Sequence, residues 1–60
     1  MTVEDIYRIT SPAQNVDIYN PKTKVFVFTG VCGDIPLNCL DIPVSQVVAV
    51  DNTLAIMVEQ

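Results

Sequence analysis

Few residues of this chain could carry out chemistry, and their spacing fits no catalytic pattern. The sequence of 60 residues contains no histidine, so both the most common general base and the most common metal ligand are missing. Ser11 and Ser45 have no activating partner in the residues around them, and we expect no nucleophilic catalysis by a hydroxyl. The sequence therefore predicts a protein that is not an enzyme and that has no cofactor.

The two cysteines, Cys32 and Cys39, have six residues between them. Zinc sites use closer pairs and four ligands per ion, so one chain could complete a site only by pooling its thiols with those of a second copy. A disulfide between them is a further alternative, although a reducing compartment would keep both as thiols. We expect ordinary buried thiols and no metal site.

Two carboxylates, Asp34 and Asp41, flank one short segment and could form an acid–base or metal-binding pair. Asp34 is also well placed to cap a helical turn, and Asp41 then falls in a solvated loop. We favour this structural role for both residues.

The chain is acidic, with a net charge of −4 and only three cations, Arg8, Lys22 and Lys24. Binding to DNA or RNA requires several phosphate-neutralising cations, so direct nucleic-acid binding is not expected. A small anionic nucleotide could still be held if the three cations gather at a subunit junction. An acidic protein also suits a partner with a basic patch. Three carboxylates could form the matching outer face: Asp17, Asp34 and Asp51.

The elements that must position these residues begin with a short helix. Thr2 is a good N-cap, and Asp5 at the third helical position forms a loose capping box with it. Val3 and Ile6 follow the spacing of one apolar face, which Tyr7 continues. Ser11-Pro12 ends the helix, because the residue before a proline is disfavoured in the α region.

Two hairpins are expected after the helix. The first joins strands over 16–19 and 24–29 through the turn 20–23. The strand 24–29 is apolar on both sides, which predicts a strand covered on both faces. The second joins strands over 47–50 and 53–58 through Asp51-Asn52, two residues that tolerate the positive φ of a two-residue turn. Between the hairpins we expect one helical turn over 34–41, with Leu37 and Leu40 pointing into the core.

These elements predict a single small domain over residues 1–60, mainly β (α+β). It would be a four-stranded antiparallel sheet of two hairpins, with the N-terminal helix on one face and the helical turn between the hairpins. A domain of this size has a thin core, and half of its residues are apolar, so association is expected. One short helix covers one face, and the other face would form the oligomer interface. The period-two rule assigns seven residues to it: Tyr19, Phe26, Phe28, Val47, Ala49, Ala55 and Met57.

The same aromatic residues have a second interpretation. Tyr7, Tyr19, Phe26 and Phe28 could stack on a base or ring of a ligand, but at strand and helix spacing such side chains usually pack in a core or an interface.

No apolar stretch approaches the roughly 20 residues of a membrane helix, and residues 2–5 do not form a basic leader. We therefore expect a protein of the cytosol.

Several short motifs carry a resemblance that spans nearly the whole chain. They are Val-Glu-Asp-Ile-Tyr at 3–7, Gly-Asp-Ile-Pro at 33–36, Leu40-Asp41, and the closing pattern Val-x-x-x-Asp-Asn-x-Leu-x-Ile at 47–56. With these motifs the chain resembles small accessory proteins of phages and mobile elements of Gram-positive bacteria. Phe26, Phe28 and Met57 depart from those relatives, which carry more charge on the second sheet face. The resemblance implies a viral or mobile-element setting, in which small acidic proteins without catalytic activity often inhibit host defence.

The function expected from all of this is a non-enzymatic binding module of the inhibitor type, assembled as a dimer or higher homo-oligomer. It would block a host protein or sequester a small signalling nucleotide in the host cytosol. The alternative is a structural or assembly subunit of a phage or mobile-element complex.

Overall fold

The chain opens with a helix of seven residues, α1 (Val3–Ile9), in a computed structural model that describes residues 1–59. Its N-cap is Thr2, as the sequence predicts, and the Asp5 carboxylate accepts a hydrogen bond of 2.8 Å from the Thr2 N–H. The helix ends at Ile9, before Ser11-Pro12. Val3 and Ile6 are buried, so one side of α1 joins the core.

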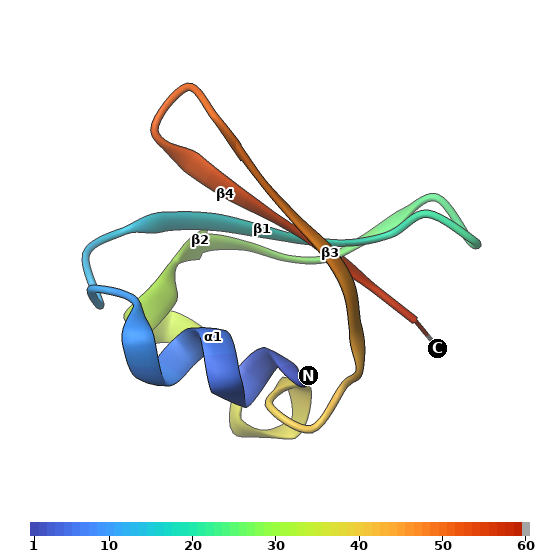
Figure 1. Ribbon diagram of the computed structural model, residues 1–60, viewed down its shortest axis with the longest axis horizontal. Helices are drawn as coiled ribbons and strands as arrows, with labels where there is room; N and C mark the ends of the chain where they lie inside the picture. Colours follow the sequence, from blue (N-terminus) through green and yellow to red (C-terminus); the bar gives the residue numbers. More distant parts are fainter. Residues whose placement is uncertain (60) are drawn as a thin grey trace.

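Four strands form one sheet in the order β2-β1-β4-β3 (Figure 1). They are β1 (Asn15–Asn20), β2 (Val25–Val31), β3 (Val44–Val50) and β4 (Thr53–Val58). Strands β1 and β2 form one antiparallel hairpin and β3 and β4 form the other, but the central strands β1 and β4 are parallel. The fold is mainly β as predicted. The prediction of a purely antiparallel sheet is wrong, because the sheet is mixed.

The parallel pair arises from the connection between the hairpins. Residues 32–43 cross one face of the sheet, so β4 meets β1 and β3 does not meet β2. This arrangement puts the two strands with the clearest apolar alternation in the centre. Val16 and Ile18 of β1 and Ile56 and Val58 of β4 are all at most 1 % exposed. Burial of apolar surface therefore favours the mixed order over two hairpins set side by side.

The crossover holds two 3-10 turns, η1 (Cys32–Asp34) and η2 (Leu37–Cys39), in place of the single helical turn predicted over 34–41. Asp34 is the last residue of η1 and Pro36 precedes η2, so Asp34 does not cap a helix. Leu37 is 84 % exposed, contrary to expectation. Leu40 packs against the core as predicted. A 3-10 turn repeats every three residues. The side chains that it directs into the core therefore differ from those that an α-helical turn would direct there.

The crossover and α1 form one layer. The Val3 N–H donates to the Ile42 carbonyl (3.0 Å) and the Glu4 N–H to the Leu40 carbonyl (2.8 Å). These bonds satisfy two of the N–H groups that the start of a helix leaves without an intrahelical partner. The core lies between this layer and the sheet. Its buried members are Val3, Ile6, Val16, Ile18, Cys32, Ile35, Cys39, Ile42, Ile56 and Val58.

The second hairpin turn has the backbone that its residues favour, and a buried side chain holds the first. Asp51 and Asn52 have φ of 47° and 64°, the two-residue turn that the sequence predicts. In the first hairpin the buried Asn20 accepts hydrogen bonds at Oδ1 from the Lys22 N–H (3.0 Å) and the Thr23 N–H (3.4 Å). Lys24 closes this turn with φ of 60°.

Strand β2 is an edge strand and none of its residues is buried, so the prediction that both of its faces are covered is wrong. Val25 and Phe26 are 54 % and 59 % exposed. The register with β1 shifts between Ile18 and Tyr19, which leaves Val27 as the extra residue of a β-bulge.

Candidate functional site

The sheet has one face that the helical layer leaves uncovered, which we call the open face. Residues directly opposite each other on neighbouring strands point to the same side, and the register therefore defines its members. In the described part of the chain, residues 1–59, α1 and the crossover lie on the other side of the sheet (Figure 1). The open face consists of Asn15, Asp17, Tyr19, Phe26, Thr29, Val31, Gln46, Val48, Val50, Thr53, Ala55 and Met57.

An aromatic pair marks one side of the open face. Tyr19 lies opposite Phe26 on β2 and opposite Met57 on β4. The Tyr19 and Phe26 rings have centroids 4.8 Å apart and planes tilted by 51°, an arrangement that aromatic pairs favour. Because Phe26 is 59 % exposed, the pair offers a preformed apolar surface to a partner.

Three of the seven residues predicted for this face lie on the helix side instead. Phe28 is opposite Ile18, Val47 opposite Ile56, and Ala49 opposite Leu54. The bulge at Val27 reverses the alternation of β2, so Phe26 and Phe28 point to opposite faces, and Phe28 packs against the core. Tyr19, Phe26, Ala55 and Met57 are on the open face, as predicted.

The register also adds residues that sequence reasoning missed on this face, notably Val48 and Val50. A signal for them was present in the sequence. A two-residue turn at Asp51-Asn52 makes Val50 the partner of Thr53, and counting back by two assigns Val48 to the same side.

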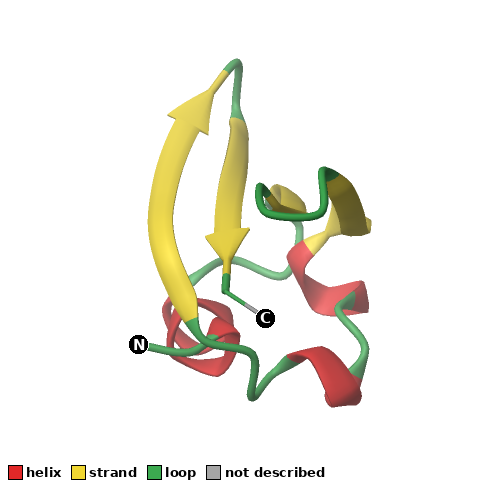
Figure 2. Cartoon of the chain, turned by 90° about the vertical axis from the view of Figure 1, so that its right-hand side faces the viewer, coloured by secondary structure: helices red, strands yellow, loops and turns green. Residues whose placement is uncertain are grey.

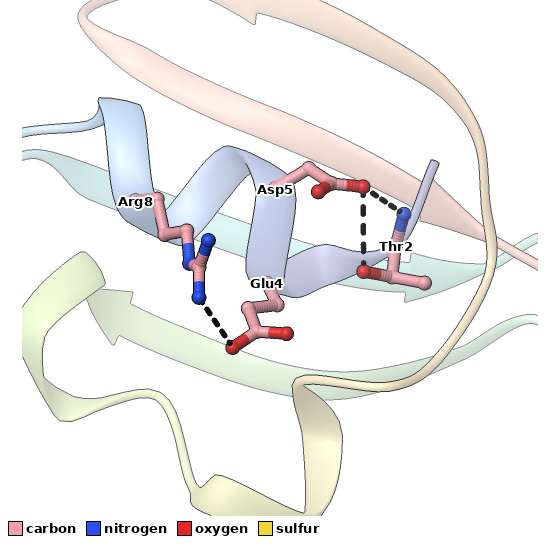
Figure 3. Close-up of polar contacts among 4 residues, drawn as sticks. All are labelled: Thr2, Glu4, Asp5 and Arg8. Carbon is pink, nitrogen blue, oxygen red and sulfur yellow. Dashed lines mark hydrogen bonds and ion pairs between the residues drawn. The ribbon is translucent and has the colours of Figure 1, made fainter.

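The three cations do not gather in one place. Arg8 lies near the end of α1 and is paired with Glu4, with 3.7 Å between Nη2 and Oε2 (Figure 3). Lys22 and Lys24 lie in the β1–β2 turn, at the other end of the long axis of the molecule (Figure 1). Lys22 borders a shallow depression of about 420 Å³ together with Pro21, Ser45, Val58 and Glu59. A single chain therefore does not combine all three charges around one phosphate.

The carboxylates are dispersed as well. Glu4 and Asp5 serve the helix, since Asp5 Oδ2 accepts from the Thr2 N–H and from Thr2 Oγ1 at 3.4 Å (Figure 3). Asp17 is on the open face, Asp34 is in the crossover layer and Asp51 is at the tip of the second hairpin. The outer acidic face predicted from Asp17, Asp34 and Asp51 is therefore not formed, and Asp17 is the carboxylate of the open face.

Both cysteines are free thiols in the core, 1 % exposed at Cys32 and 7 % at Cys39. Burial raises the pKa of the Cys32 thiol, because removal from water disfavours the thiolate. Asp34 and Asp41 are exposed. Across residues 1–59 no group of three or more His, Cys, Asp and Glu side chains is arranged to hold a metal ion.

Comparisons with known proteins return no relative: no family model, curated protein or solved structure matches this chain. None of the helices in the described part of the chain is long and apolar enough to cross a membrane. The open face, with its aromatic pair and its single carboxylate, is therefore the candidate binding surface within residues 1–59.

Proposed function

We propose that this chain is a non-enzymatic binding module of the inhibitor type, which binds a partner protein through its open face. One observation carries the proposal. A mainly apolar sheet face, with a preformed Tyr19–Phe26 pair at 4.8 Å, has nothing over it in residues 1–59. Contiguous apolar patches of this kind on small proteins commonly mark binding sites.

The charges indicate the chemistry of the partner. The chain carries −4 overall, one of its three cations is engaged with Glu4, and Asp17 lies within the open face. A complementary partner has an apolar patch rimmed by lysine or arginine, because charge complementarity speeds association and suppresses wrong partners. Burial of about 500 Å² of apolar surface contributes roughly 12 kcal/mol of binding free energy at 25 cal/mol per Å². The loss of translational and rotational freedom on association offsets a large part of it.

The biological setting in this proposal is the cytosol of a Gram-positive host, and the partner is a host protein of phage defence. This setting rests on the resemblance of the sequence motifs to phage accessory proteins. Sequestration of a nucleotide is less favoured, because Arg8 and the two lysines lie at opposite ends of the molecule and phosphate groups demand converging donors.

The test is a capture experiment from a Gram-positive lysate with three versions of the immobilised protein. They are the wild type, Phe26→Asp on the open face, and Ile9→Asp as a matched control. Ile9 is an 86 % exposed apolar residue of α1, so both variants add one charge at an exposed apolar position. A protein bound by the wild type and by Ile9→Asp, but lost with Phe26→Asp, supports the proposal.

The captured protein is then purified, and hydrogen exchange of this chain is followed with and without it. Protection is expected in the four strands of the sheet and not in α1 or the crossover. Binding that survives Phe26→Asp but is abolished by reversing the charges of Arg8, Lys22 and Lys24 would overturn the proposal. Mass measurement of the small molecules carried along would then identify a nucleotide.

A further inference from the structure

Strand β3 is an edge strand. At its start the Val44 N–H donates to the Met1 carbonyl (2.8 Å), and the outward backbone groups further along the strand are free within residues 1–59. Within the described sheet its neighbour is β4, and the two-residue turn makes Val50 and Thr53 a hydrogen-bonded pair. Hydrogen-bonded and non-bonded pairs alternate along an antiparallel ladder. Val48 therefore directs its N–H and C=O to β4, whereas Val47 and Ala49 direct theirs outward. Figure 2 shows the β3–β4 hairpin extending beyond the helical segments, with the N-terminus beside the start of β3.

Over Gln46–Val50 the β3 edge lacks the features that usually prevent pairing between sheets. The segment Val44–Val50 contains no charged residue and no proline. Its register with β4 shifts once, between Val44 and Gln46, and is regular from Gln46 to Val50. Natural edge strands are commonly protected by charges, prolines or bulges. The other edge, β2, is interrupted in the middle of the strand by the bulge at Val27, and Gly30 has φ of 148°.

We propose that two copies of the chain pair through β3, antiparallel, about a two-fold axis at Val48. Val47 of each copy then lies opposite Ala49 of the other, and their outward N–H and C=O groups form four hydrogen bonds. The two sheets become one sheet of eight strands, and their open faces become continuous. This inference concerns the assembly of the protein and does not depend on the proposed function of the open face.

The sequence of β3 favours a second copy as the occupant of this edge. The register is self-complementary, since the same residues supply donors and acceptors on both sides. It pairs only the uncharged segments Gln46–Val50 of two chains that each carry −4, so that no carboxylates meet. Because the β2 edges are interrupted by the bulge, the pairing stops at two copies and yields a closed dimer.

The expected dimer is weak. Pairing of one short strand from each copy buries less than the roughly 1,200 Å² typical of stable interfaces, so the dimer should dissociate on dilution. Sedimentation equilibrium from about 10 µM to 1 mM measures this. Ala49→Pro removes an outward N–H without removing a bond to β4, a position where proline is tolerated in edge strands. Ala49→Val is the matched control, which keeps the N–H.

Wild type and Ala49→Val should dimerise with similar constants, and Ala49→Pro should weaken the dimer about tenfold or more, because two of the four hydrogen bonds are lost. Circular dichroism checks that Ala49→Pro is folded. If Ala49→Pro is unfolded, the dimerisation of the wild type alone tests the proposal. In a mixture of labelled and unlabelled protein, NMR should show a contact between the Hα atoms of Val48 in the two copies, which lie close in a non-bonded pair.

Three results would overturn the inference. The first is a wild-type protein that stays monomeric at 1 mM, even if an unrelated extended peptide binds along β3. The second is a dimer whose intermolecular contacts map to Phe26 and Met57 on the open face. The third is a folded Ala49→Pro variant that dimerises as well as the wild type.

Discussion

Tyr19 and Phe26 pack against each other across the β1–β2 pair, with ring centroids 4.8 Å apart, while Phe28, two positions further on, faces the core. The bulge at Val27 separates the roles of the two phenylalanines. Phe26 belongs to the binding surface and Phe28 to the folded interior. The pair therefore offers an internal comparison between a functional and a structural aromatic residue.

Phe28→Ala should lower the free energy of unfolding by about 2–4 kcal/mol, because it leaves a cavity beside Ile18. Phe26→Ala should lower it by no more than about 1.5 kcal/mol, the worth of an aromatic pair, since the side chain is 59 % exposed. Urea unfolding followed by circular dichroism measures both. Equal losses for the two variants would show that the bulge does not separate the residues as described.

Asn20→Ala should destabilise the protein by about 1–3 kcal/mol. The side chain is 3 % exposed, and its Oδ1 accepts from the Lys22 and Thr23 N–H groups, so removing it leaves two donors of the turn without their acceptor. Asn38→Ala, at an exposed site, is the control and should change stability by less than about 0.5 kcal/mol. Urea midpoints of the two variants give the comparison, and a neutral Asn20→Ala would contradict the described turn.

Asp5→Ala should cost about 0.5–2 kcal/mol, the usual effect of a lost N-terminal cap. The Asp5 carboxylate accepts from the Thr2 N–H at 2.8 Å. Glu4→Ala removes the neighbouring carboxylate, which pairs with Arg8 at 3.7 Å on the exposed surface. It should cost less than about 0.5 kcal/mol, as exposed pairs of this kind contribute little. Thermal unfolding of both variants measures the difference, and a larger effect for Glu4 would be inconsistent with this assignment.

Stability should fall above about pH 9 in a way that depends on Cys32. Burial raises the pKa of this thiol above its ordinary value of 9.0, so the folded chain retains a proton that the unfolded chain loses. Below pH 9.0 both states hold the proton and the thiol has no effect on the pH dependence. As the pH rises through the folded pKa, the unfolded state is favoured. The drop in unfolding free energy from pH 8 to pH 10 should be steeper for the wild type than for Cys32→Ala. Parallel curves would count against a buried thiol.

The two cysteines should be dispensable for folding. Both are free and buried, and they act as small apolar side chains. Replacing both Cys32 and Cys39 with alanine should leave a folded protein that is less stable by a few kcal/mol at most. Circular dichroism and metal analysis test this together. A double variant that both unfolds and loses bound zinc would refute it.

Features that depend on neighbouring residues could be predicted from the sequence. Thr2 and Asp5 define the start of α1, and Asp51-Asn52 define a two-residue turn, because their side chains and backbone preferences act over three or four positions. The alternation of Val16 and Ile18 also predicted the buried side of β1. These local preferences hold however the elements are packed.

The sheet order, the open face and the separation of the cations were decided by the tertiary structure. Whether β4 pairs with β1 or β3 pairs with β2 depends on how the crossover 32–43 packs across the sheet. The bulge at Val27 depends on pairing with β1, and one extra residue there reverses the side to which Phe28 points. The two-residue alternation of side chains along a strand does not reveal such a shift in the sequence. Register and topology result from burying the greatest apolar area among segments far apart in the chain.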